Sequence, residues 1–222
     1  MEGTDGWKFC CEEAREWGTW REKKRKFSKA GPRSPLYSDG ERNRKTMSTS
    51  LLSELEQLAA ALDQEGVTVE NSLPAVGEKI AKELGVKADE VAILAVSTKW
   101  RHLHFLVPQP LKNVGYIPLT SNSALAARTV RESRPEINND FSGARHATVF
   151  EGVRTAMASG ESIHKIISAP ILHEGKVVGV MQISRKGTSA ATCGPDFTAE
   201  DLGKVLALCR PLGRLVQHFG GE

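Results

Sequence analysis

The sequence predicts an α+β domain built around an antiparallel sheet. Leucines at helical spacing open the globular part of the chain, at Leu51, Leu55, Leu58 and Leu62. Two strand-like segments, 166–172 and 177–185, are separated by a Glu-Gly turn and therefore predict a hairpin. The expected order along the chain is helices, strands, helices, the hairpin and a terminal helix.

The first 46 residues differ in composition from the rest. They hold 12 Lys and Arg against 8 Asp and Glu, which leaves 18 and 19 for residues 47–222. The excess positive charge therefore belongs to this segment, which we expect to be a basic, disordered leader. Met47 opens ordinary helix-forming sequence and is a candidate for the true start. A basic nucleic-acid-binding arm is the alternative interpretation.

Two helices and three strands are expected in the first half of the domain. The first helix carries the four leucines, and the second spans 73–84, with Asn71 or Ser72 as cap and Gly85 as its end. The expected strands are the apolar run 91–96, the alternating segment 102–107 and the short segment 116–119, listed in chain order.

The second half is expected to begin and end with helices. A helix over 123–133, a loop over 136–145 and a helix over 147–158 precede the hairpin. Thr198 caps the last helix, with Asp201 as the acid of a capping box. Pro211 should kink that helix or end its first half, because proline lacks the backbone amide.

Four segments together resemble a GAF domain. They are Gly115–Thr120, Asn122–Asp140, Ser168–Ser184 and Asp196–Leu202, and the likeness extends over about residues 51–216. The resemblance implies a six-stranded antiparallel sheet, with the N- and C-terminal helices on one face and a ligand pocket on the other. It divides the chain into the leader 1–46, N-terminal helices 47–88 and a GAF-like domain 89–220.

The resemblance also implies a sensory function. GAF-like domains commonly bind small molecules or dimerise, and most are attached to an output domain. The chain shows no output-domain pattern, so we expect it to act in trans through a signalling partner protein. No stretch has the ~20 apolar residues that span a bilayer, and the N-terminus lacks a secretory signal. We therefore expect a cytoplasmic protein with neither a membrane nor a nucleic-acid partner.

The loop before the expected helix 147–158 is the most attractive binding site for an unidentified small molecule. It concentrates polar side chains, among which Arg145 can hold a carboxylate or phosphate. The alternative is that its Asn and Asp residues only satisfy turn backbone. The expected ligand-binding residues are Asn138, Asn139, Asp140, Arg145, His146, Phe150 and Met181.

Other chemistries find weaker support in the sequence. His102 and His104 can share a strand face as metal ligands, but no third ligand is near, and we predict no metal site. Haem through His146 or His164 is an open alternative, and no cofactor is identified. A free-methionine sulfoxide reductase would need a thiol pair, whereas the domain offers only Cys193 and Cys209 on different elements.

A homodimer is the expected assembly. Its interface would join the first and last helices of two copies, through Leu51, Leu55, Leu58, Leu62, Leu202, Val205 and Cys209. The alternative is that these residues cover the domain's own sheet. Three interpretations stay open: a non-enzymatic ligand sensor, which we favour, a sulfoxide reductase, and a structural dimerisation module with a filled pocket.

Overall fold

The computed structural model describes residues 49–62, 72–113, 115–141 and 161–220. Residues 45–222 form one compact unit. The expected helix over 147–158 and the leader 1–46 lie outside the described residues. Within the described ranges, no helix combines the length and the apolar character needed to cross a membrane.

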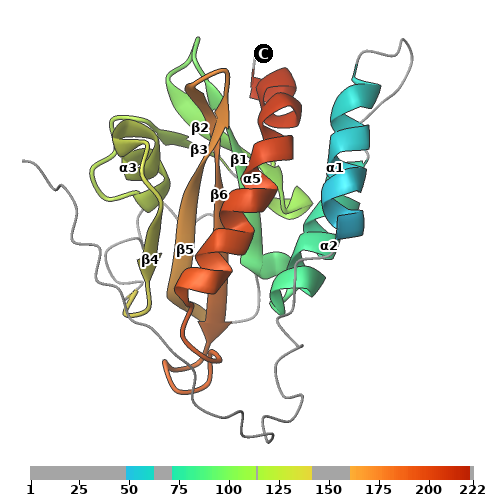
Figure 1. Ribbon diagram of the computed structural model, residues 1–222. Coiled ribbons are helices and arrows are strands. Elements are labelled where there is room, and N and C mark those ends of the chain that lie inside the picture. The colour runs from blue at the N-terminus through green and yellow to red at the C-terminus, as the bar shows by residue number, and fades with distance from the viewer. Residues whose placement is uncertain (1–48, 63–71, 114, 142–160, 221–222) are drawn as a thin grey trace, which may run out of the picture. The chain divides into compact units, whose positions relative to one another are not determined.

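The fold is α+β, with a six-stranded antiparallel sheet as predicted (Figure 1). The strand order is β3-β2-β1-β6-β5-β4. The bounds are β1 Val91–Ser97, β2 His102–Val107, β3 Tyr116–Pro118, β4 Glu136–Asn138, β5 Ser162–His173 and β6 Lys176–Gly187. Short 3-10 turns precede β1 at Ala88–Glu90 and follow β2 at Gln109–Leu111.

The hairpin of β5 and β6 forms the centre of the domain. Glu174 and Gly175 both have positive φ, 48° and 76°, which is the left-handed geometry that suits a two-residue hairpin turn. The predicted turn is thus confirmed, and the strands extend further than the sequence indicated. The register of β5 and β6 shifts by one residue between Ile171 and Leu172. Pairs beyond this point are therefore offset by one residue from those next to the turn.

Three helices cover one side of the sheet, which we call the α5 face: α1 Thr49–Ala61, α2 Leu73–Leu84 and α5 Ala199–Gly220 (Figure 1). They bury a single apolar core against β1, β5 and β6, in which Leu55, Ile80, Met181 and Leu212 are fully buried. The N-terminal helices therefore belong to the same core as the sheet.

α5 starts at the predicted capping box. The Asp201 amide donates to Thr198 Oγ1 at 3.2 Å, and the Thr198 amide donates to Asp201 Oδ2 at 2.8 Å. The helix then runs through Pro211, so of the two expected outcomes, a kink or an end, the end was wrong. The missing amide removes one helical bond, while Leu208 and Leu212, on either side, are fully buried against the sheet and hold both turns in place.

The opposite side of the sheet, the α3 face, carries α3 Leu125–Glu132 (Figure 1). Leu94, Phe105 and Val180 pack there in a second apolar cluster. The expected loop at 136–145 was wrong at its start, because residues 136–138 form edge strand β4. Three residues are too few to show an alternating pattern, and the strand exists because β5 offers it free backbone groups for pairing.

The leucine seam packs within one chain. Leu51 and Leu55 on α1, and Val205 and Cys209 on α5, are buried in the same core, while Leu58, Leu62 and Leu202 are partly buried against it. The first helix is therefore covered by α5 of the same chain.

Candidate functional site

Two polar side chains interrupt the buried centre of the hairpin on the α3 face. Ser168 on β5 is fully buried, and Gln182 on β6 is 6% exposed. They are direct cross-strand partners, because the register places Ser168 opposite Gln182 and also opposite Glu136 of β4. Side chains that lie opposite each other share a face of the sheet, so these residues form a polar row across three strands.

A chain of hydrogen bonds links this row to α3. The Thr129 hydroxyl donates to the Leu125 carbonyl at 3.0 Å, as a helical threonine can. Since that proton is used, Ser168 donates to Thr129 across 2.7 Å and accepts from Gln182 Nε2 at 3.2 Å. The side-chain oxygen of Gln182 has no partner among the described residues and is the acceptor that this chain leaves available.

Charged residues beside the row are already paired. Nη2 of Arg128 on α3 donates to both oxygens of the Glu136 carboxylate, at 2.7 and 2.6 Å. Arg131 donates to the carbonyls of Leu119 and Ser121 at 2.8 and 2.7 Å. The Arg128 and Arg131 guanidinium groups are thus committed to neighbours, while Thr129, Ser168 and Gln182 supply neutral hydrogen-bonding groups.

Of the predicted binding residues, the structure brings two together. Asn138 Oδ1 accepts a 3.0 Å bond from the Asp140 amide, which is the turn-forming role that Asn commonly takes. Asn139 bonds to the backbone of Phe197 instead. Met181 is fully buried in the core under α5, on the other side of the sheet from α3. Arg145, His146 and Phe150 lie outside the described residues.

Sequence reasoning missed the polar row itself. The available signal was a polar residue within each of two apolar strand segments, Ser168 in 166–172 and Gln182 in 177–183. Counting pairs outward from the Glu174-Gly175 turn places Ser168 opposite Met181. The register shift near Leu172 moves the pairing by one, so that Ser168 meets Gln182.

The thiols and histidines are placed apart from this row. Cys209 is buried in the α5 core, and burial raises the pKa of its thiol from 9.0 to about 12. Cys193, in the loop before α5, is buried and donates to the Ala190 carbonyl at 3.1 Å. His102 and His104 lie on one face of β2 with ring centroids 6.2 Å apart. Across the described ranges, no three His, Cys, Asp or Glu side chains gather as metal ligands.

The comparisons with known proteins agree with this architecture. The family model described as GAF domain matches residues 52–215, which is most of the chain. The protein therefore belongs to the GAF domain family, whose members are commonly sensory or signalling modules. No match was found among curated proteins.

Solved structures similar to the chain include the GAF domain from Acinetobacter phosphoenolpyruvate-protein phosphotransferase. It is 17% identical with a TM-score of 0.52, and the match covers 78% of this chain and 95% of that one. Residues 122 to 287 of a methyl-accepting chemotaxis protein are 15% identical with a TM-score of 0.53, covering 75% and 95%. At these identities the likeness establishes the fold alone.

A third similar structure is the type II free methionine-R-sulfoxide reductase from Thermoplasma acidophilum. It is 14% identical with a TM-score of 0.48, and the match covers 76% of this chain and 98% of that chain. This likeness carries no argument about activity.

Proposed function

We propose that the protein is a sensory GAF domain that binds a small molecule on the α3 face and acts in trans through a partner protein. The observation that carries the proposal is the chain of hydrogen bonds that joins Ser168 and Gln182 of the polar row to Thr129 of α3. The bond from Gln182 Nε2 to Ser168 fixes the side-chain amide, and its oxygen, Oε1, is left as an acceptor for a ligand donor.

The position of the row indicates where the ligand would lie. Leu94 of β1 and Phe105 of β2 already pack in one apolar cluster with Val180 of β6 and Ala127 of α3, so the β1 and β2 side of the α3 face is filled. A ligand would therefore lie toward β4, β5 and β6, where Ser184 and Asn138 add further neutral groups. Asn138 and Asp140 stay in the proposed site, whereas Met181, beneath α5, is not part of it.

Native mass spectrometry of the freshly purified full chain tests this proposal. We expect an adduct of small mass that is released on denaturation. Gln182→Met keeps the side chain's length but removes its polar atoms, so the adduct should fall about tenfold, since losing one buried hydrogen bond costs about 1.4 kcal/mol. Gln217→Met, at an exposed position on α5, is the matched control and should keep the adduct.

The proposal fails if the adduct is the same in both variants. It fails also if the chain carries no adduct and no amino acid, nucleotide or nucleobase raises its melting temperature. That second outcome would favour the structural module, for which the filled β1 and β2 side of the α3 face is the supporting observation.

The reductase interpretation receives no support from the described thiols. Cys209 is held in its protonated form within the core on the α5 face, whereas the thiolate is the reactive species. The polar row, in contrast, contains no nucleophile that is activated by a neighbouring base.

A further inference from the structure

The sheet separates the proposed ligand site on the α3 face from α5 on the opposite face. This inference rests on the proposed function, because a ligand on the α3 face can act on α5 only through the sheet or around its edge. β4 is the edge strand on the side of the polar row. Backbone at an edge can reach both faces, since no further strand lies beyond it.

The residues around the end of β4 do reach both faces. Ile137 packs with the core on the α5 face, while Phe141 is buried with Leu125 of α3 and Ile166. The Phe141 amide also donates to the His164 carbonyl at 2.8 Å, which continues the attachment to β5. Asn139 lies between these two positions, at the point where the chain passes from one face to the other.

Asn139 is bonded to the residue that precedes the cap of α5. Its Nδ2 donates to the Phe197 carbonyl at 3.0 Å, and its Oδ1 accepts from the Phe197 amide at 2.9 Å. One side-chain amide thus satisfies both backbone groups of Phe197. Thr198, the next residue, caps the helix. If Asn139 moves, Phe197 loses these bonds, and the first turn of α5 loses the support of the residue before its cap.

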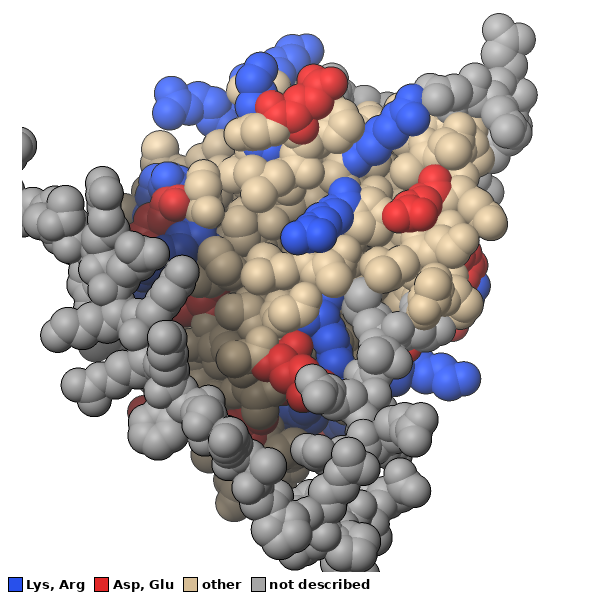
Figure 2. Space-filling view, in the orientation of Figure 1, with Lys and Arg blue, Asp and Glu red and all other residues tan. Residues whose placement is uncertain are grey.

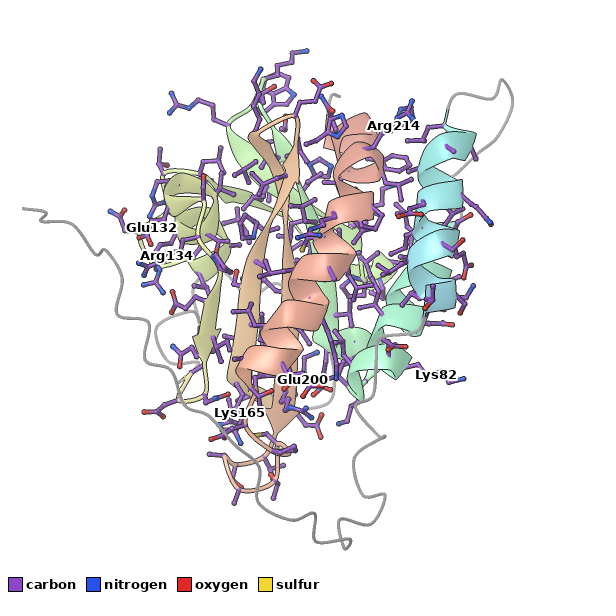
Figure 3. All side chains as sticks on the ribbon, in the orientation of Figure 1. Lys82, Glu132, Arg134, Lys165, Glu200 and Arg214 are labelled. Atoms are coloured by element: carbon purple, nitrogen blue, oxygen red, sulfur yellow. The ribbon has the colours of Figure 1, made fainter. Side chains whose placement is uncertain are left out.

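The segment that holds Phe197 is itself anchored to the hairpin. The Phe197 ring is buried, with the Arg185 guanidinium 4.7 Å from its centre. Lys165 on β5 binds the Gly194 carbonyl and the Asp196 carboxylate, each at 2.7 Å. Figure 3 shows Lys165 at the end of the sheet where α5 begins, near Glu200. The contact that this segment receives from the side of β4 is the Asn139 side chain.

α5 is not equally constrained along its length. A Cβ at Gly213 would meet the Leu172 carbonyl, and one at Gly220 would lie 2.7 Å from the Val96 carbonyl, so the C-terminal half lies against the sheet backbone. A Cβ at Gly203 would meet nothing within 4 Å. Pro211 removes one backbone bond between the two halves. Gly203 is exposed, whereas Val205 and Leu208 are fully buried against the sheet. The first turn of α5, before Val205, is therefore the part that can respond.

We propose that the Asn139 side chain couples the α3 face to the first turn of α5, by holding Phe197 and hence the helix cap. Release of Asn139 loosens the first turns of α5, and loosening of the cap in turn releases Asn139. Such coupling is reciprocal by thermodynamic necessity. It gives Asn139 a positioning role rather than the ligand contact that the sequence suggested.

Hydrogen exchange of the full chain tests the coupling without any ligand. In Asn139→Ala, amide exchange over residues 197–203 should rise about tenfold, while exchange over 212–218 stays unchanged. Asn139→Asp keeps an acceptor for the Phe197 amide and should give an intermediate rise. Asn138→Ala is the matched control, because it removes the neighbouring turn bond to Asp140 and should leave 197–203 unchanged.

A reciprocal experiment separates coupling from a purely local role. Thr198→Ala removes the helix cap and should raise exchange at the Phe141 amide in the wild-type background, but not in the Asn139→Ala background. The proposal is overturned if Asn139→Ala leaves 197–203 protected, if Asn138→Ala has the same effect, or if Thr198→Ala acts equally in both backgrounds. None of these outcomes bears on whether a small molecule binds the α3 face.

Discussion

At the scale of single residues, Glu90 shows how a charged group is used inside this fold. Its carboxylate is 5% exposed and accepts bonds from the Lys186 amide at 2.6 Å and the Lys87 amide at 2.7 Å. Its backbone carbonyl accepts from Ser184 at 3.2 Å. Glu90 thus fastens the turn before β1 to β6, and the charge is offset by hydrogen bonds from two backbone amides.

Cys209 leads to a prediction about pH. Its thiol pKa is raised from 9.0 to about 12 in the folded protein, so the folded chain keeps a proton that the unfolded chain releases above pH 9. Stability from this group is complete below pH 9 and declines as pH rises toward 12. Relative to Cys209→Ala, the wild type should lose about 1 kcal/mol of unfolding free energy between pH 9 and 10.

Urea unfolding of both proteins in reducing buffer, at half-unit steps from pH 7.5 to 10.5, measures this difference. Parallel pH profiles for wild type and Cys209→Ala would contradict the prediction. Native alkylation at pH 8 supplies a second readout, since a buried protonated thiol should react only after unfolding.

At the scale of elements, the glycines decide how closely α5 approaches the sheet. Gly213 faces the Leu172 carbonyl, and Gly179 on β6 lies where a Cβ would contact both the Leu94 carbonyl and Val216. A glycine therefore stands on each side of the helix–sheet contact, where a larger residue would not fit. The same helix carries Gly203 over open space, so its glycines differ in role.

This difference predicts opposite effects for two matched substitutions. Gly213→Ala should destabilise the protein by about 2–4 kcal/mol, because the new methyl group would meet backbone that cannot move cheaply. Gly203→Ala should stabilise it by about 0.5–1 kcal/mol through helix propensity alone. Chemical unfolding measures both, and a Gly213→Ala protein as stable as wild type would show that α5 can shift outward.

At the scale of the whole molecule, the described part of the domain has apolar clusters on both faces of one sheet. In Figure 2, the surface over α5 and α1 carries isolated charged side chains separated by uncharged ones. The partly buried Leu52, Leu58, Leu202 and Leu206 belong to these two helices. We propose a second copy of the chain as the partner that covers them.

Light scattering at micromolar concentration should therefore report twice the mass of one chain. Leu206→Glu should weaken self-association at least about tenfold, because it places a charge in the proposed interface. Gln57→Glu, at an exposed position on α1, is the matched control and should leave the mass unchanged. A monomer in the wild type, or equal masses for both variants, would contradict the homodimer.

The elements with strong local signals could be predicted from the sequence. The Thr198–Asp201 capping box, Gly85 at the end of α2 and the Glu174-Gly175 turn each specify a local geometry, and the structure confirms each of them. The Ser72 side chain does not cap α2. Before α3, in contrast, the Ser121 hydroxyl does accept a bond from the Ala124 amide. Such choices depend on where the preceding chain is held, which the residues alone do not specify.

What the sequence determined by itself is the α+β class and the GAF resemblance, because these follow from hydrophobic period, turn residues and the order of segments. Tertiary structure alone decided which polar residues share a face. A one-residue shift in the hairpin register brings Ser168 to Gln182 and leaves Met181 under α5. Tertiary structure also decided the role of Asn139, which bonds to the backbone of Phe197. The physical reason is that side chains alternate between faces every residue, so a single unpaired residue reverses the assignment.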